Sequence, residues 1–181
     1  MPIYVTIPDS EAFDDKTNQF LQVKGRRIQL EHSLKSIAVW ESKWHKPYLS
    51  KDPKTKEELL DYIRCMTLTK DVDPIIYYFI PEEEMQRIAE YIEDPMTATT
   101  FKKENSTGPN NKIVTNEILY YDMIALNIPL ECEKWHLNRL ITLIRVCSEK
   151  NKPDKKMSKN EIMRRNRALN AARRKKLGTK G

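Results

Sequence analysis

The chain has 181 residues, of which 39% are apolar and 32% are charged, a balance typical of one soluble, mainly helical domain. It contains no run of about 18 apolar residues, so we expect no membrane span. Residues 1–5 lack the basic start and apolar centre of a signal peptide. The four glycines are scattered and form neither a dinucleotide-binding motif nor a P-loop, which argues against the commonest nucleotide-using enzymes.

Short β-prone runs open the chain. Residues 3–7, 20–23 and 26–32 are β-branched or alternate between apolar and polar side chains. Turn-forming residues separate these runs, namely Pro8-Asp9-Ser10, Asp14-Asp15 and Lys24-Gly25. The pattern predicts a small β-hairpin or meander over residues 1–32.

A first helix is predicted directly after the β element. Ser33 is a suitable N-cap for residues 34–46, whose apolar side chains recur at helical spacing until Pro47 ends the helix. Trp40 and Trp44 are four residues apart and belong to this apolar stripe. They could stack on nucleic-acid bases, but the helical spacing favours packing in a core or an interface.

Two further helix starts are recognisable from local chemistry. Thr55 and Glu58 form a capping box, which predicts a second helix. Pro81 is suited to a helix start, and the carboxylates of residues 82–84 match the positive end of the helix dipole. This third helix is predicted to stop before Pro95. Its expected buried residues are Met85, Ile88, Ala89 and Ile92.

The most apolar part of the chain follows a polar stretch. Residues 102–112 have no apolar member and are predicted to be a mobile surface loop. Two helical segments come next, residues 118–127 and residues 130–147, with Pro129 between them. The second is apolar nearly all round, so we expect it at the centre of the core or in an oligomer interface.

Cys132 and His136 are the best candidates for a metal site, because a spacing of four would place both on one face of a helix. A structural zinc needs four ligands, and no second pair is recognisable, so a buried thiol and a core histidine are the better interpretation. The three cysteines are odd in number and lack CxxC spacing, which is typical of reduced thiols. No catalytic residue, metal or cofactor is predicted.

The charge of the chain is divided unequally. Residues 152–181 contain seven Lys and five Arg against only Asp154 and Glu161, which gives a net charge of +10. Because the whole chain carries +6, residues 1–151 carry −4. An acidic body is therefore joined to a basic segment, and this asymmetry of charge predicts that the segment binds a negatively charged partner or the body itself.

The basic segment is predicted to contain a helix of its own. Residues 150–156 are a polar linker, and Ser158 with Glu161 forms a capping box for a helix that reaches about Lys176. We therefore predict a globular body, residues 1–151, and a basic linker with a C-terminal helical arm, residues 152–181. The expected fold class is α+β, mainly α, with a small N-terminal β-hairpin or meander, a helical bundle and a basic C-terminal helix.

Such an arm would be marginally stable alone and is expected to order on a partner or on the body. One possible partner is nucleic acid, which an arginine-rich segment can bind as it folds. The other is the acidic surface of a protein helix, and the charge alone does not choose between them. The candidate contact residues are Arg164, Arg165, Arg167, Arg173, Arg174, Lys175 and Lys176.

Five stretches of the sequence point to a known group of proteins. They are residues 40–47 (WESKWHKP), 95–101 (PMTATTF), 123–129 (MIALNIP), 135–140 (WHLNRL) and 167–173 (RALNAAR). With these stretches the chain resembles tail assembly chaperones of long-tailed bacteriophages, many of which are called only hypothetical. The resemblance extends over most of the chain, from about Gln29 to Gly181.

The resemblance implies a non-enzymatic role in the cytoplasm of the host. Chaperones of this group coat the tape-measure protein, a long helical chain that would otherwise aggregate, and help to deliver tail-tube subunits. We expect Trp40, Trp44, Trp135 and Leu140 to supply apolar surface for a client or for self-association. The arm could bind the acidic body of a neighbouring copy, and contacts of that heterologous kind build open filaments.

Two other functions are compatible with the same residues. One is a structural subunit of the virion, such as a connector or tail protein, whose arm would lock onto adjacent subunits. The other is a nucleic-acid-binding protein that uses residues 152–181 against phosphates.

Overall fold

The computed structural model describes residues 1–14, 18–101, 113–151 and 159–178. It divides into two compact units, Met1–Ser148 and Glu149–Gly181, and each is described by itself. The predicted loop over residues 102–112 and the predicted cap at Ser158 lie outside the described residues.

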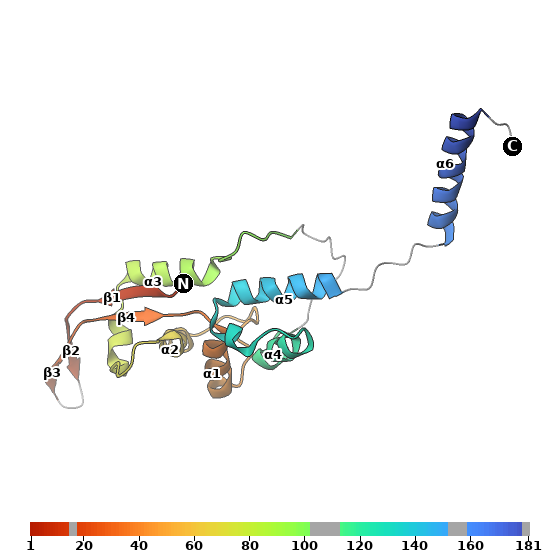
Figure 1. The fold of residues 1–181 in the computed structure, drawn as a ribbon. Coiled ribbons are helices and arrows are strands. Elements are labelled where there is room, and N and C mark those ends of the chain that lie inside the picture. The colour runs from red at the N-terminus through yellow and green to blue at the C-terminus, as the bar shows by residue number, and fades with distance from the viewer. Residues whose placement is uncertain (15–17, 102–112, 152–158, 179–181) are drawn as a thin grey trace. The chain divides into compact units, whose positions relative to one another are not determined.

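Two antiparallel strand pairs open the chain (Figure 1). Strand β1, Ile3–Ile7, pairs with β4, Arg26–Leu30, and β2, Ser10–Asp14, pairs with β3, Gln19–Val23. The sequence predicted a hairpin or meander here but read Ser10 and Asp14 as turn residues, so β2 is an addition. Strand β2 contains few residues with high β-propensity and owes its conformation to its pairing with β3.

Gly25 allows the links between the two strand pairs to pass each other closely. A Cβ atom at this position would lie 2.5 Å from the backbone nitrogen of Asp9, which is closer than a side chain can come. The amide of Gly25 donates instead to the carboxylate of Asp9, at 2.6 Å. This contact joins the β1–β2 link to the β3–β4 link.

Helices α1, Leu34–Trp44, and α2, Lys56–Met66, begin where the sequence predicted. The side chain of Ser33 accepts a hydrogen bond from the amide of Ser36, and Thr55 with Glu58 forms the predicted capping box. After α2 the chain runs beside β4, because the amide of Leu68 donates to the carbonyl of Gln29, at 2.8 Å.

A short 3₁₀ helix, η1 (Pro74–Phe79), precedes α3 (Glu82–Glu93). Helix α3 starts after Pro81, as predicted, and packs its buried residues Ile88 and Tyr91 into the body. Ala89 is exposed, although its spacing in the sequence predicted that it would be buried.

The predicted helix over residues 130–147 is broken in the structure. A 3₁₀ helix, η2 (Leu130–Lys134), comes first, and α5 (Leu137–Asn151) begins only after His136. The break arises from pairing with a distant segment, because His136 forms a β-bridge with Ser33 and the amide of Leu137 donates to the carbonyl of His32, at 2.8 Å. Only one side of α5 is buried, which corrects the prediction of a helix apolar nearly all round. The buried residues are Leu137, Leu140 and Ile144.

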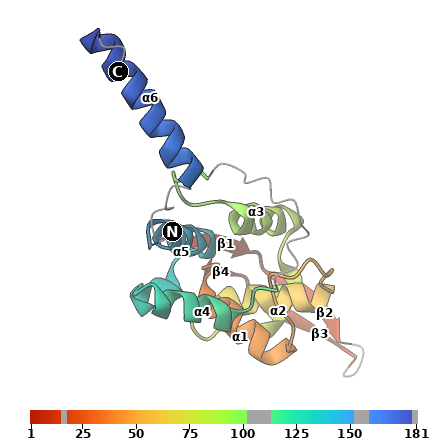
Figure 2. The ribbon, with the colours of Figure 1, turned by 90° about the vertical axis from the view of Figure 1, so that its right-hand side faces the viewer.

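The body is built in layers around the first strand pair. Helix α3 lies on one side of β1 and β4, while α1, α2 and α4 (Asn116–Ala125) lie on the other (Figures 1 and 2). The alternation of the strands supplies the buried residues Val5, Ile7, Ile28 and Leu30. The fold is α+β and mainly α, as the sequence predicted.

Helix α6, Lys159–Leu177, belongs to the second unit, and none of its 19 residues is buried. None of the helices in residues 1–14, 18–101, 113–151 and 159–178 combines the length and the hydrophobicity that a membrane span requires.

Candidate protein-binding surfaces

Trp40 and Leu140 are core residues. The Trp40 side chain is 1% exposed, and its indole N–H donates to the carbonyl of Glu58, at 2.9 Å. Leu140 is completely buried. The packing interpretation of Trp40 is therefore confirmed, and neither side chain offers surface to a partner in the folded body, contrary to the expectation from the sequence.

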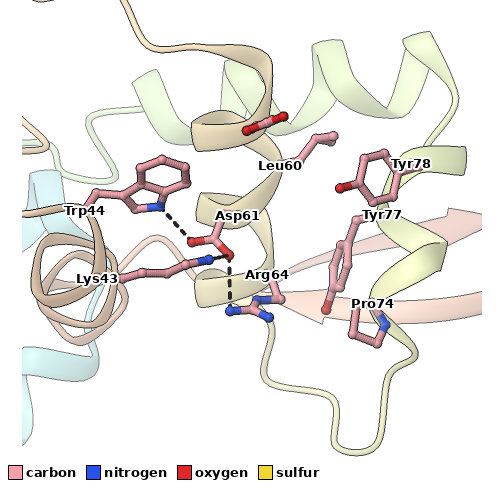
Figure 3. A pocket seen from close by; sticks show the side chains of 9 residues that line it. Lys43, Trp44, Leu60, Asp61, Arg64, Pro74, Tyr77 and Tyr78 are labelled. Carbon is pink, nitrogen blue, oxygen red and sulfur yellow. Dashed lines mark hydrogen bonds and ion pairs between the residues drawn. The ribbon is translucent and has the colours of Figure 1, made fainter.

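Trp44 lies at the surface end of the same helix, where it contacts a carboxylate shared by three donors (Figure 3). Its indole N–H donates to Asp61 at 2.8 Å, and Lys43 and Arg64 form ion pairs with the same carboxylate at 2.7 and 3.1 Å. Partial burial by itself would raise the pKa of Asp61, but the hydrogen bonds from Lys43 and Trp44 and the charge of Arg64 lower it overall.

These residues border a pocket of about 280 Å³ between α1, α2 and η1. Its apolar wall comes from Leu60, Pro74, Tyr77 and Tyr78 (Figure 3). The pocket thus has this apolar wall on one side and, on the other, a carboxylate whose lowered pKa makes it a weak general base near neutral pH. Of the predicted candidates, Trp44 is the one that lines it.

Trp135 is half-buried and covered by a cation. The guanidinium of Arg139 lies over the indole, 4.1 Å from the ring centroid. An Arg–Trp stack of this kind is stabilising, and it occupies one face of the ring that a client would otherwise use.

Two histidines form a polar cluster inside the body. Nδ1 of His32 lies 2.5 Å from the Tyr62 hydroxyl, and Nε2 of His136 donates to the carbonyl of Tyr91, at 2.9 Å. Burial lowers the pKa of His32 to about 3, with a smaller contribution from the neighbouring His136, so the ring is neutral at physiological pH. The cluster joins the β4–α1 link, α2, α3 and the link before α5, which is a structural role.

Cys132 and His136 do not share a helix, because Cys132 belongs to η2 and His136 lies in the link before α5. Within the part of the chain that the structure describes, no three His, Cys, Asp or Glu side chains are placed to hold a metal ion.

A buried carboxylate fixes the orientation of α4. Glu41 of α1 accepts hydrogen bonds from the amide and the side chain of Asn116, at 2.8 and 2.6 Å, and from the amide of Tyr48, at 2.6 Å. Leu119 and Met123 are buried beneath the helix. The opposite side of α4 is consequently held toward solvent.

That outer side is apolar. Ile118, Tyr121 and Ile124, spaced by three residues, are 44%, 69% and 67% exposed, and we call them the α4 face. The sequence predicted a helix over residues 118–127 and assigned no binding surface to it. Apolar residues on both sides of a helix of only 10 residues, at the surface of a small body, are the signal of a binding face.

Helix α6 presents basic and apolar side chains together. All seven predicted basic contact residues on it are exposed, Arg164, Arg165, Arg167, Arg173, Arg174, Lys175 and Lys176. The large apolar residues of the helix are exposed as well, Ile162, Met163, Leu169 and Leu177. A polar helix face would need no such side chains, whereas a docking helix uses both kinds.

A scan of protein-family models, a search of curated proteins and a search of solved structures each return no match to this chain.

Proposed function

We propose that the protein is a non-enzymatic assembly chaperone of a long-tailed bacteriophage, which acts in the host cytoplasm on the tape-measure protein and on tail-tube subunits. The resemblance of residues 40–47, 95–101, 123–129, 135–140 and 167–173 provides the class. The observation that carries the proposal is α6, a helix without a buried residue whose surface combines basic and apolar side chains.

The physical argument begins with the stability of α6. An isolated helix of 19 residues is marginal in water, since most helical stability in proteins comes from packing an apolar face. Ile162, Met163 and Leu169 are available for such packing. A partner that covers them would stabilise the helix and gain about 25 cal/mol for each Å² of apolar surface that it buries.

The charge of α6 indicates what kind of surface its partner has. Arginine and lysine on a docking helix accelerate association with a negatively charged surface and disfavour basic partners. A long helical client with acidic faces fits this requirement. The pocket beside Trp44 could receive a protruding side chain of the same client.

The proposal is tested by co-expressing the full chain with a fragment of a phage tape-measure protein. We expect the soluble fraction of the fragment to rise several-fold, and the gain to be lost when Ile162 and Leu169 are both replaced by Ser. A matched variant, Lys51→Glu with Lys56→Glu, changes exposed residues of the body and should keep the gain. An equally insoluble fragment with and without the chain would refute the proposal.

Nucleic-acid binding is a second candidate, because the same arginines and lysines would serve against phosphates. The exposed Ile162, Met163 and Leu169 favour a protein partner. RNA affinity that falls linearly with the logarithm of salt concentration, and that disappears when residues 152–181 are deleted, would support nucleic acid instead.

A further inference from the structure

The α4 face lacks a partner within the described body, yet it is built as a contact surface. Ile118, Tyr121 and Ile124 form a row along α4, and each is at least 44% exposed. Glu41 and the buried Leu119 and Met123 hold the helix from the other side. The row is therefore presented on a rigid support, as the central anchors of protein interfaces are.

The chain segment that carries this face is acidic. The segment from Asn116 to Glu133 contains four carboxylates and no Lys, Arg or His. The carboxylates are Glu117, Asp122, Glu131 and Glu133. Tyr120 of α4 donates to Glu133 at 2.8 Å, so η2 and its acidic residues lie beside α4.

Helix α6 has the complementary composition. It combines exposed Ile162, Met163 and Leu169 with arginines and lysines, and Glu161 is its one acidic residue. In a docked arrangement, the apolar residues of α6 would contact the α4 face, and its basic residues would lie near the carboxylates of the same segment. Helix-in-groove recognition uses this arrangement, with apolar anchors for affinity and rim charges for orientation and association rate.

We propose that α6 of one copy docks on the α4 face of a second copy. This rests on the part of the proposed function that makes α6 a protein-docking helix, and it gives α6 a partner surface on a second copy when no client is bound. Donor and acceptor are different patches of the chain, so the contact is heterologous. Repeated from copy to copy, it builds an open, head-to-tail assembly.

The test uses the full-length, nuclease-treated protein without any client. Sedimentation over a wide concentration range at low salt should show species that grow beyond the dimer with concentration. Higher salt should shift them back toward the monomer, because the charged rim is screened. An acceptor variant, Tyr121→Asp with Ile124→Asp, and a donor variant, Arg167→Glu with Arg173→Glu, should each be monomeric.

Mixing the two variants gives the decisive measurement. The acceptor variant retains an intact α6 and the donor variant retains an intact α4 face, so one productive contact remains between them. An equimolar mixture should form heterodimers and nothing larger. As a control, Leu68→Asp replaces an exposed apolar side chain outside the α4 face, 53% exposed, and should assemble as the unchanged protein does.

Three results would overturn the proposal. The unchanged protein could be monomeric at every concentration, the acceptor variant could assemble normally, or the mixture could remain monomeric, as it would if α6 docked on its own chain. Circular dichroism checks that the variants are folded, and Tyr121→Ser replaces the double acceptor variant if it is not. Because no client is present, a failure here is separate from a failure of the solubility test.

Discussion

The hydroxyl of Tyr62 lies 2.5 Å from Nδ1 of His32, in the interior of the body. The His136 ring lies beside them, 5.1 Å from the His32 ring between centroids, and its Nδ1 has no hydrogen-bond partner among the described residues. Both imidazoles must be neutral for the native packing to persist, because a charge on either ring would be desolvated and charges on both would repel each other.

This arrangement predicts loss of stability in mild acid. Burial lowers the pKa of His32 from 6.5 to about 3, with a smaller contribution from His136. Between these two pH values the unfolded chain therefore binds a proton at His32 and the folded chain does not. The stability that depends on neutral His32 is thus complete above pH 6.5 and declines as the pH falls toward 3. Each pH unit should cost up to about 1.4 kcal/mol.

Urea unfolding between pH 7.5 and 4.5 measures the effect. His32→Asn should flatten the pH dependence of the unfolding free energy, whereas His45→Asn, at an exposed position, should leave it as it is. Equal slopes for the unchanged protein and His32→Asn would show that other groups control the acid response.

Trp40 is predicted to be a stability residue. Trp40→Ala removes a buried indole and its hydrogen bond to Glu58, and should lower the free energy of unfolding by about 3–5 kcal/mol. The neighbouring Val39 is half-exposed, and Val39→Ala should change stability by about 0.5 kcal/mol or less. Similar losses for the two variants in denaturant titrations would contradict the buried position of Trp40.

Glu41 should control the attachment of α4. Glu41→Ala leaves the amides of Tyr48 and Asn116 without their acceptor, at a cost of about 1–3 kcal/mol for each group that stays buried. Hydrogen exchange should accelerate in α4 more than in α3. Glu57→Ala changes an exposed carboxylate of α2 and provides the control. Uniform exchange across the body would mean that α4 is held by other contacts.

A chaperone is predicted to be absent from the finished particle. Mass spectrometry of purified virions from cells that produce this protein should detect tail subunits and none of its peptides. Stoichiometric amounts in the virion would support the structural-subunit alternative, in which the arm locks onto adjacent subunits.

Local chemistry made the helix starts predictable. Ser33 and Thr55 cap α1 and α2 because a cap is decided within four residues of sequence. Strand β2 and the start of α5 depend on distant partners. The pairing of Ser33 with His136, and of Ser10 with Val23, leaves no trace in the local pattern.

The candidate surfaces were predictable to a different degree. Charge alone located the arm, and its basic residues are exposed on α6. Trp40 and Leu140 are buried and so are not binding surfaces. The sequence could not predict this, because an apolar stripe has the same pattern whether it faces a core or a client. The α4 face was not predicted from the sequence, because its exposure depends on how Glu41 holds the helix, which is a tertiary relationship.

The bond from Leu137 to His32 has a consequence for synthesis on the ribosome. Residues more than a hundred positions apart must meet before the β element and the last helix of the body can close together. A nascent chain that ends before Leu137 leaves His32 and its apolar neighbours uncovered, so folding of the body awaits nearly its whole length. The basic arm is then the next segment to emerge, when the surface that we propose for its docking has just been completed.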